Sequence, residues 1–145
     1  MMTRTLVAAM CASLASFAAA GMAMANTTPI EGVWQTRDDG GQVEIFDCGG
    51  KICGRGHGST TLTAGDDPKD VHNHDPALRN RPLLGLEVIH NFAGGPTTWT
   101  GGTLYRPQDG GTYSGSLHLV DPDTLKVTGC LAPILCQSQV WKRVR

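Results

Sequence analysis

Hydrophobic and polar residues alternate along most of the chain after residue 31, and clusters of Gly, Asp and Pro interrupt the alternation at short intervals. In residues 112–120, Tyr113, Leu117 and Leu119 share one face, whereas Ser114 and His118 share the other. This period of two is typical of strands, and the clusters between the strands predict turns. The pattern predicts strands over residues 32–36, 42–47, 51–56, 83–90, 99–106, 112–120, 125–131 and 137–144.

The connections between most of these segments are as short as those of hairpins, so neighbouring strands should pair antiparallel. We therefore expect an all-β domain, an eight-stranded antiparallel up-and-down barrel, because closure removes the open edges of a sheet. A barrel of eight strands is either filled by its own side chains or just wide enough to hold one small ligand.

Residues 58–82 form a long connection without a strand pattern. Loops of this length in compact domains usually have a function or are disordered. The pair Asp75–Pro76 is typical of an N-cap followed by proline at the first helical position. We expect a short helical turn that ends before Pro82, in a loop that forms a lid or a plug at one end of the barrel.

The first 25 residues have the pattern of a secretory signal peptide. Arg4 precedes an uncharged apolar run over residues 6–20, and Ala23 and Ala25 put small side chains before a cleavage site. The run is shorter than the roughly 20 residues that span a bilayer, which disfavours a retained anchor. We expect cleavage after Ala25, a single domain over residues 26–145 without a transmembrane segment, and a periplasmic or secreted location.

Four cysteines follow the signal segment, namely Cys48, Cys53, Cys130 and Cys136. An even number in an exported protein predicts disulfides, and four cysteines allow three pairings. We favour the two local pairs, Cys48–Cys53 and Cys130–Cys136. A redox-active pair and a zinc site are the alternatives, but the spacings match neither CxxC nor the usual zinc motifs.

Charge and motifs exclude several classes of function. The chain has 12 basic and 13 acidic residues and lacks a basic run, so we expect no nucleic-acid partner. It contains no P-loop, no dinucleotide-binding fingerprint and no G-x-S-x-G motif. We therefore predict no catalytic residues and no cofactor, and lean against an enzyme.

The long connection contains the main polar candidates. His72 and His74 are weak candidates for a metal site, and the alternative is a solvated loop in which Asp75 caps a turn. Arg79 and Arg81 could bind the carboxylate or phosphate of a ligand, and the alternative is that they tie the loop to the barrel. Tyr105, Tyr113 and Trp99 would suit a ligand-binding wall, although core packing uses the same residue types.

The chain also resembles a known family over nearly all of the expected domain. The matching stretches are GVW at 32–34, DCGGKICG at 47–54, NHDPALRNRPLLG at 73–85, WTGG at 99–102, YRPQDG at 105–110 and Trp141. They resemble the domain-of-unknown-function 2147 family of small exported bacterial proteins. The resemblance implies a calycin-like, lipocalin-type barrel and little about chemistry. One departure is His74, where the family usually has proline.

Gly32 and Trp34 also resemble the start motif of lipocalins. In that family the tryptophan closes the floor of the barrel, and a basic residue of the last strand covers its ring. The resemblance implies this barrel-closing role for Trp34, with Arg143 or Lys142 as the cation.

These expectations favour one function, the non-catalytic binding of a small apolar or amphipathic ligand, such as a lipid, inside the barrel. The first alternative is an envelope-associated interaction or structural module with a filled barrel and a protein partner. The second is a metal-dependent enzyme that uses residues 66–81.

Overall fold

The computed structural model describes residues 28–37, 40–59, 63 and 65–145. The predicted signal peptide, residues 1–25, lies outside the described residues.

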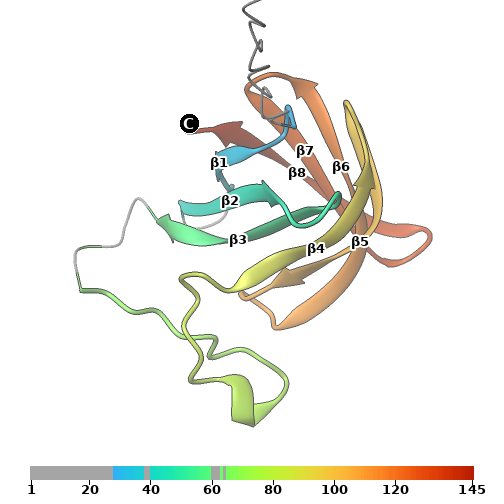
Figure 1. Cartoon of the computed structure of the whole chain (residues 1–145). Helices are drawn as coiled ribbons and strands as arrows, with labels where there is room; N and C mark the ends of the chain where they lie inside the picture. Colours follow the sequence, from blue (N-terminus) through green and yellow to red (C-terminus); the bar gives the residue numbers. More distant parts are fainter. Residues whose placement is uncertain (1–27, 38–39, 60–62, 64) are drawn as a thin grey trace, which may run out of the picture.

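The described chain forms a closed barrel of eight strands, in which each strand pairs antiparallel with its neighbour in sequence and the last strand returns to the first (Figure 1). The predicted eight-stranded antiparallel up-and-down barrel is therefore confirmed. The strands are β1 (Gly32–Gln35), β2 (Gly41–Asp47), β3 (Ile52–Ser59), β4 (Glu87–Gly94), β5 (Thr98–Arg106), β6 (Gly111–Asp121), β7 (Thr124–Ala132) and β8 (Leu135–Arg143).

The predicted strand over residues 83–90 is wrong in its position. Residues 83–86 belong to the preceding loop, where the Leu83 N–H donates to the Pro68 carbonyl at 2.9 Å. The strand continues through residues 91–94, beyond its predicted end at residue 90. Asn91 makes this continuation possible because it adopts a φ of 55°, which Asn tolerates better than most residues.

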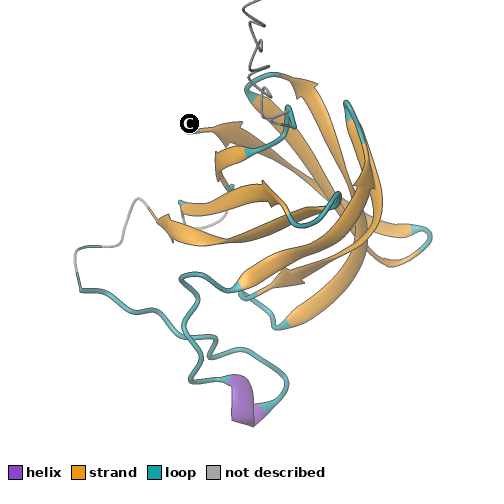
Figure 2. Ribbon diagram, viewed as in Figure 1, coloured by secondary structure: helices purple, strands orange, loops and turns teal. Residues whose placement is uncertain are grey.

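The described part of the long β3–β4 connection contains a single 3-10 turn, η1 (Pro76–Leu78), as predicted (Figure 2). Asp75 is its N-cap, and its carboxylate accepts a hydrogen bond from the Ala77 N–H at 3.0 Å. The two arms of the connection meet in a bridge between Lys69 and Pro82. The connection therefore folds back on itself beside the barrel and extends away from the ends of β3 and β4 (Figure 1).

Large side chains fill the end of the barrel opposite this connection. Trp34, Phe92 and Ile30 are fully buried there, and Trp99 nearly so. The Trp34 indole N–H donates to the Ile30 carbonyl at 2.9 Å, which satisfies its polar atom inside the apolar core. This end of the barrel is closed by packing.

Arg143 joins the last strand to the first at the closed end. It pairs with Trp34 in the β1–β8 ladder, and its guanidinium carbon lies 4.3 Å from the Trp34 ring centroid. The same guanidinium donates to the carbonyls of Glu31 at 2.6 Å and Pro29 at 2.7 Å. One cation thus connects β8, the Trp34 ring and the segment that leads into β1.

Both local cysteine pairs are disulfides. Cys48–Cys53 closes the β2–β3 hairpin, and Cys130–Cys136 closes the β7–β8 hairpin at the other end of the barrel. The predicted pairing is confirmed.

Gly102 gives a test of how tightly β5 packs against β4. A Cβ at this position would lie 2.3 Å from the His90 carbonyl oxygen and 2.4 Å from the buried Phe92 ring. We expect Gly102→Ala to lower the free energy of unfolding by about 1–3 kcal/mol, because overpacking forces the backbone to move.

Gly129→Ala is the matched control, since a Cβ there meets its nearest neighbour, Tyr113, at 3.4 Å, an ordinary contact. Urea unfolding followed by tryptophan fluorescence compares the two variants. Equal stability of Gly102→Ala and Gly129→Ala would contradict this description of the packing.

Candidate ligand-binding cavity

The end of the barrel that carries the long connection is open. A cavity of about 1060 Å³ extends from the middle of the barrel out past its rim. Residues of the turns between β1 and β2, β5 and β6, and β7 and β8 surround its mouth, together with residues 68, 69, 71, 72, 83 and 84 of the long connection. The deep part is lined mainly by Val43, Val88, Ile89, Leu104, Val127 and Trp141.

Small side chains create this space. Gly129 lies in the cavity wall, and a Cβ added there would contact Tyr113 and Leu104. Trp141 is mostly buried, and its indole N–H donates to the Gln139 side chain at 3.1 Å. The deep wall is therefore apolar, with its one indole donor already satisfied within the protein.

The rim of the cavity combines polar and apolar residues. Lys69, His72, Arg106 and Asp109 supply titratable groups. Arg106 forms an ion pair with Asp109 at 3.2 Å, and Lys69 forms one with Asp67. The apolar part of the rim consists of Val71, Leu83, Leu84, Leu131, Ile134 and Leu135.

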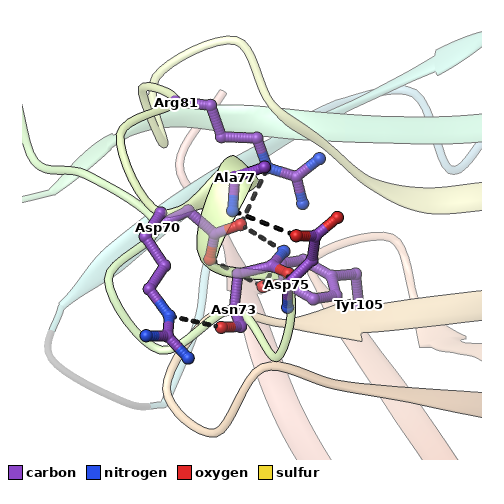
Figure 3. A network of polar contacts seen from close by, with 7 residues as sticks. Asp70, Asn73, Asp75, Ala77, Arg81 and Tyr105 are labelled. Atoms are coloured by element: carbon purple, nitrogen blue, oxygen red, sulfur yellow. Dashed lines mark hydrogen bonds and ion pairs between the residues drawn. The ribbon is translucent and has the colours of Figure 1, made fainter.

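Asp70 fixes the long connection to the barrel (Figure 3). Its carboxylate is fully buried and accepts hydrogen bonds from the Tyr105 hydroxyl at 2.6 Å, the Asn73 amide at 2.9 Å and Arg81 Nε at 2.8 Å. The Arg81 guanidinium also lies over the Tyr105 ring, 5.3 Å from its centroid. Because Tyr105 is on β5, this network holds the connection against the strand that leads to the mouth.

The network changes the pKa values of its members. Burial raises the pKa of Asp70, but the hydrogen bonds from Tyr105, Asn73 and Arg81 outweigh it, so the net pKa lies below the ordinary value. Burial and the neighbouring Asp70 carboxylate raise the pKa of Tyr105. Asp70 is therefore ionised and Tyr105 neutral at physiological pH.

A second set of contacts holds the connection against the β5–β6 turn. His74 Nε2 lies 3.0 Å from the Asp109 carbonyl oxygen and donates to it. A Cβ on Gly110, whose φ is 70°, would lie 2.0 Å from the His72 carbonyl oxygen, so the backbones approach too closely for any side chain. Asp109 itself accepts from the Tyr113 hydroxyl at 2.7 Å. The connection thus extends one wall of the barrel beyond the mouth.

The structure separates the residues that the sequence suggested for ligand binding. Tyr105 and Tyr113 line the cavity, but Arg79, Arg81 and Trp99 do not. Arg81 is held by Asp70 and faces a smaller hollow of about 570 Å³ outside the barrel. Arg79 Nε donates to the Asn73 carbonyl at 2.8 Å, and Trp99 is part of the closed end.

The histidines of the connection have different surroundings. His72 lines the cavity, whereas His74 is bonded to the β5–β6 turn. Within the part of the chain that the structure describes, no three His, Cys, Asp or Glu side chains are arranged to hold a metal ion.

Sequence reasoning missed the two features that shape the mouth. No pattern in the sequence singles out Asp70, although it is the buried centre of the network. Leu131, Ile134 and Leu135 were not singled out. The signal for them was present, because Cys130 and Cys136 enclose a segment of apolar residues around Pro133 where a solvated turn would be polar.

The fold and the open cavity define a lipocalin-like barrel. It is similar to protein HP1028 from Helicobacter pylori, which is described as belonging to the lipocalin family. The two structures have a TM-score of 0.71 and 25% sequence identity, over 79% of this chain and 82% of that chain. None of the curated proteins compared with the chain matches it.

Residues 32–143 match the model of the family described as "Uncharacterized protein conserved in bacteria (DUF2147)". The chain therefore belongs to this family.

The Asp70 network gives a direct test of what holds the connection. We expect Asp70→Asn to destabilise the protein by about 2–3 kcal/mol, because it removes the charge that Arg81 pairs with and replaces an acceptor oxygen with an amide donor that faces other donors. Asp67→Asn is the control, since Asp67 and Lys69 form an exposed pair worth less than about 1 kcal/mol. Urea unfolding at pH 7 measures both, and equal losses would contradict a special role for Asp70.

The same carboxylate predicts a pH dependence. The pKa of Asp70 is lower in the folded protein than the value of about 3.9 of an unfolded aspartate. Its contribution to stability is therefore complete well above pH 4 and is lost as the pH falls through the folded pKa.

We expect the stability difference between wild type and Asp70→Asn to be constant from pH 7 to pH 5 and to shrink below about pH 4. Unfolding curves recorded across this range measure it. A difference that persists unchanged at pH 2 would show that Asp70 acts through its shape and not through its charge.

Proposed function

We propose that the protein binds a small, largely apolar or amphipathic ligand inside the barrel, without catalysis. The observation that carries this proposal is the cavity of about 1060 Å³ with an apolar deep wall. Ligand pockets in proteins commonly measure about 300–1,000 Å³ and are lined by apolar side chains with a few polar groups. A barrel filled by its own side chains would have no such space.

The distribution of polar groups indicates how the ligand lies. Val43, Val127 and Trp141 line the deep part, which would hold an alkyl or ring system. Lys69 and Arg106 are at the rim, where they would meet a polar head group. We assign the anchoring role to this pair instead of Arg79 and Arg81, because neither of those arginines lines the cavity.

We also propose that the protein works in the periplasm or outside the cell after removal of residues 1–25. Two disulfides support this, since such bonds persist in oxidising compartments. Within the described residues there is no helix long and apolar enough to cross a membrane.

The alternatives receive less support. A structural module with a filled barrel does not account for the cavity. A metal-dependent enzyme that uses residues 66–81 has no cluster of ligands among the described residues to support it.

Quenching by a brominated 16-carbon fatty acid tests the proposal. Trp141 lines the cavity, whereas Trp34 and Trp99 are buried in the closed end. Because bromine quenches indole fluorescence at short range, we expect saturable quenching of the wild type that is lost in Trp141→Phe and kept in Trp99→Phe.

A blocking variant gives the control for this titration. Gly129→Phe puts a ring into the cavity wall, and we expect at least tenfold weaker binding. Val140→Phe adds the same ring to an exposed position on β8 outside the cavity, and it should bind as the wild type does. Quenching that is unchanged in Trp141→Phe and Gly129→Phe would place the fatty acid elsewhere and overturn the proposal.

A further inference from the structure

The tip of the β7–β8 hairpin exposes three aliphatic side chains next to one another. Leu131 is 72% exposed, Ile134 92% and Leu135 62%. Isolated exposed apolar residues are normal, but adjacent ones mark contact with a protein or a membrane. Figure 1 shows this hairpin extending beyond the neighbouring strands.

This apolar tip is continuous with the cavity. Leu131, Ile134 and Leu135 all line the mouth, and Val71 and Leu84 from the long connection line it as well. Val71 is 58% exposed and Leu84 40%. An apolar molecule that enters the cavity from an apolar phase in contact with this rim would not cross water.

The paired backbone of the hairpin lowers the free-energy cost of moving it out of water. Its strands pair up to the tip, with Cys130 opposite Cys136 and Ala132 opposite Leu135. Pro133 in the turn has no N–H group to satisfy. No charged residue occurs between Val127 and Trp141, so insertion would bury no charge.

The composition favours lipid over a protein partner. Protein interfaces rely on Trp, Tyr and Arg, and Leu is under-represented among the residues that dominate their energetics. The tip consists of Leu131, Ala132, Pro133, Ile134 and Leu135 and has none of those types. A protruding, uncharged, aliphatic tip has the properties of a segment that enters the acyl region of a bilayer.

We propose that the β7–β8 tip docks the open end of the barrel onto a lipid bilayer and places the apolar side of the cavity mouth against the acyl chains. This inference rests on the proposed function, because it states where the apolar ligand enters and leaves. The Cys130–Cys136 disulfide keeps the tip in its hairpin form during docking.

Flotation with vesicles of uncharged phosphatidylcholine tests the docking. We expect wild-type protein to float with the vesicles and the double variant Leu131→Ser, Ile134→Ser to bind at least tenfold more weakly, since two exposed aliphatic side chains no longer enter the lipid. Val120→Ser is the matched control, because Val120 is 56% exposed near the closed end of β6 and should have no effect.

A second measurement locates the contact. Ile134→Trp should be quenched by lipids brominated on their acyl chains, whereas Val120→Trp should not. No vesicle binding by the wild type, equal loss in Val120→Ser, or dimerisation through the tip in sedimentation experiments would overturn the proposal.

The two proposals fail in different ways. Pro133→Asp puts a charge on the exposed tip at a residue that does not line the cavity, so this variant should lose vesicle binding but still bind the brominated fatty acid added from solution. Loss of vesicle binding with retained fatty-acid binding supports docking by the tip. If the wild type binds vesicles but takes up no fatty acid, the barrel is a membrane-bound protein without a ligand. This result would overturn the role of the tip in ligand entry.

Discussion

The contact between Arg143 and Trp34 is the constraint on which the rest of the barrel depends. An up-and-down barrel closes only if its last strand pairs with its first, and β1 is short. Arg143 pairs with Trp34 in that ladder, covers its ring and binds the backbone that precedes β1. The guanidinium therefore holds together β1 and β8, which are far apart in the sequence and pair through only two residue pairs of their ladder.

Because one end of the barrel is tightly packed, the fold stays stable with an open cavity at the other end. Trp34, Trp99 and Phe92 concentrate the buried area in the closed half, and the open half has Gly129 in its wall and aliphatic side chains at its rim. The long connection adds to this wall without filling the barrel, because Asp70 binds it to Tyr105 on β5. The division between a packed half and an open half is the structural basis of the proposed ligand binding.

Most of the fold could be predicted from the sequence because its signals are local. Alternation and turn residues define the strands, and each disulfide joins cysteines within one hairpin. The position of β4 was missed because Asn91 adopts a positive φ that the pattern does not reveal. The centre of the site was missed for another reason: Asp70 and Tyr105 are far apart in the chain, and only the folded barrel brings them together. Arg79 and Arg81 looked like ligand anchors because the sequence cannot show that the protein itself binds them.

The central claim is that the barrel contains a cavity occupied by an apolar ligand. Native mass spectrometry of the protein purified from a periplasmic expression host, followed by denaturing extraction, tests it most directly. We expect a mass excess that extraction resolves into a lipid or another apolar molecule, or a one-to-one adduct when a 16-carbon fatty acid is added. A protein mass without any adduct, even with the fatty acid in excess, would contradict ligand binding in the cavity and indicate a barrel that acts through its surface.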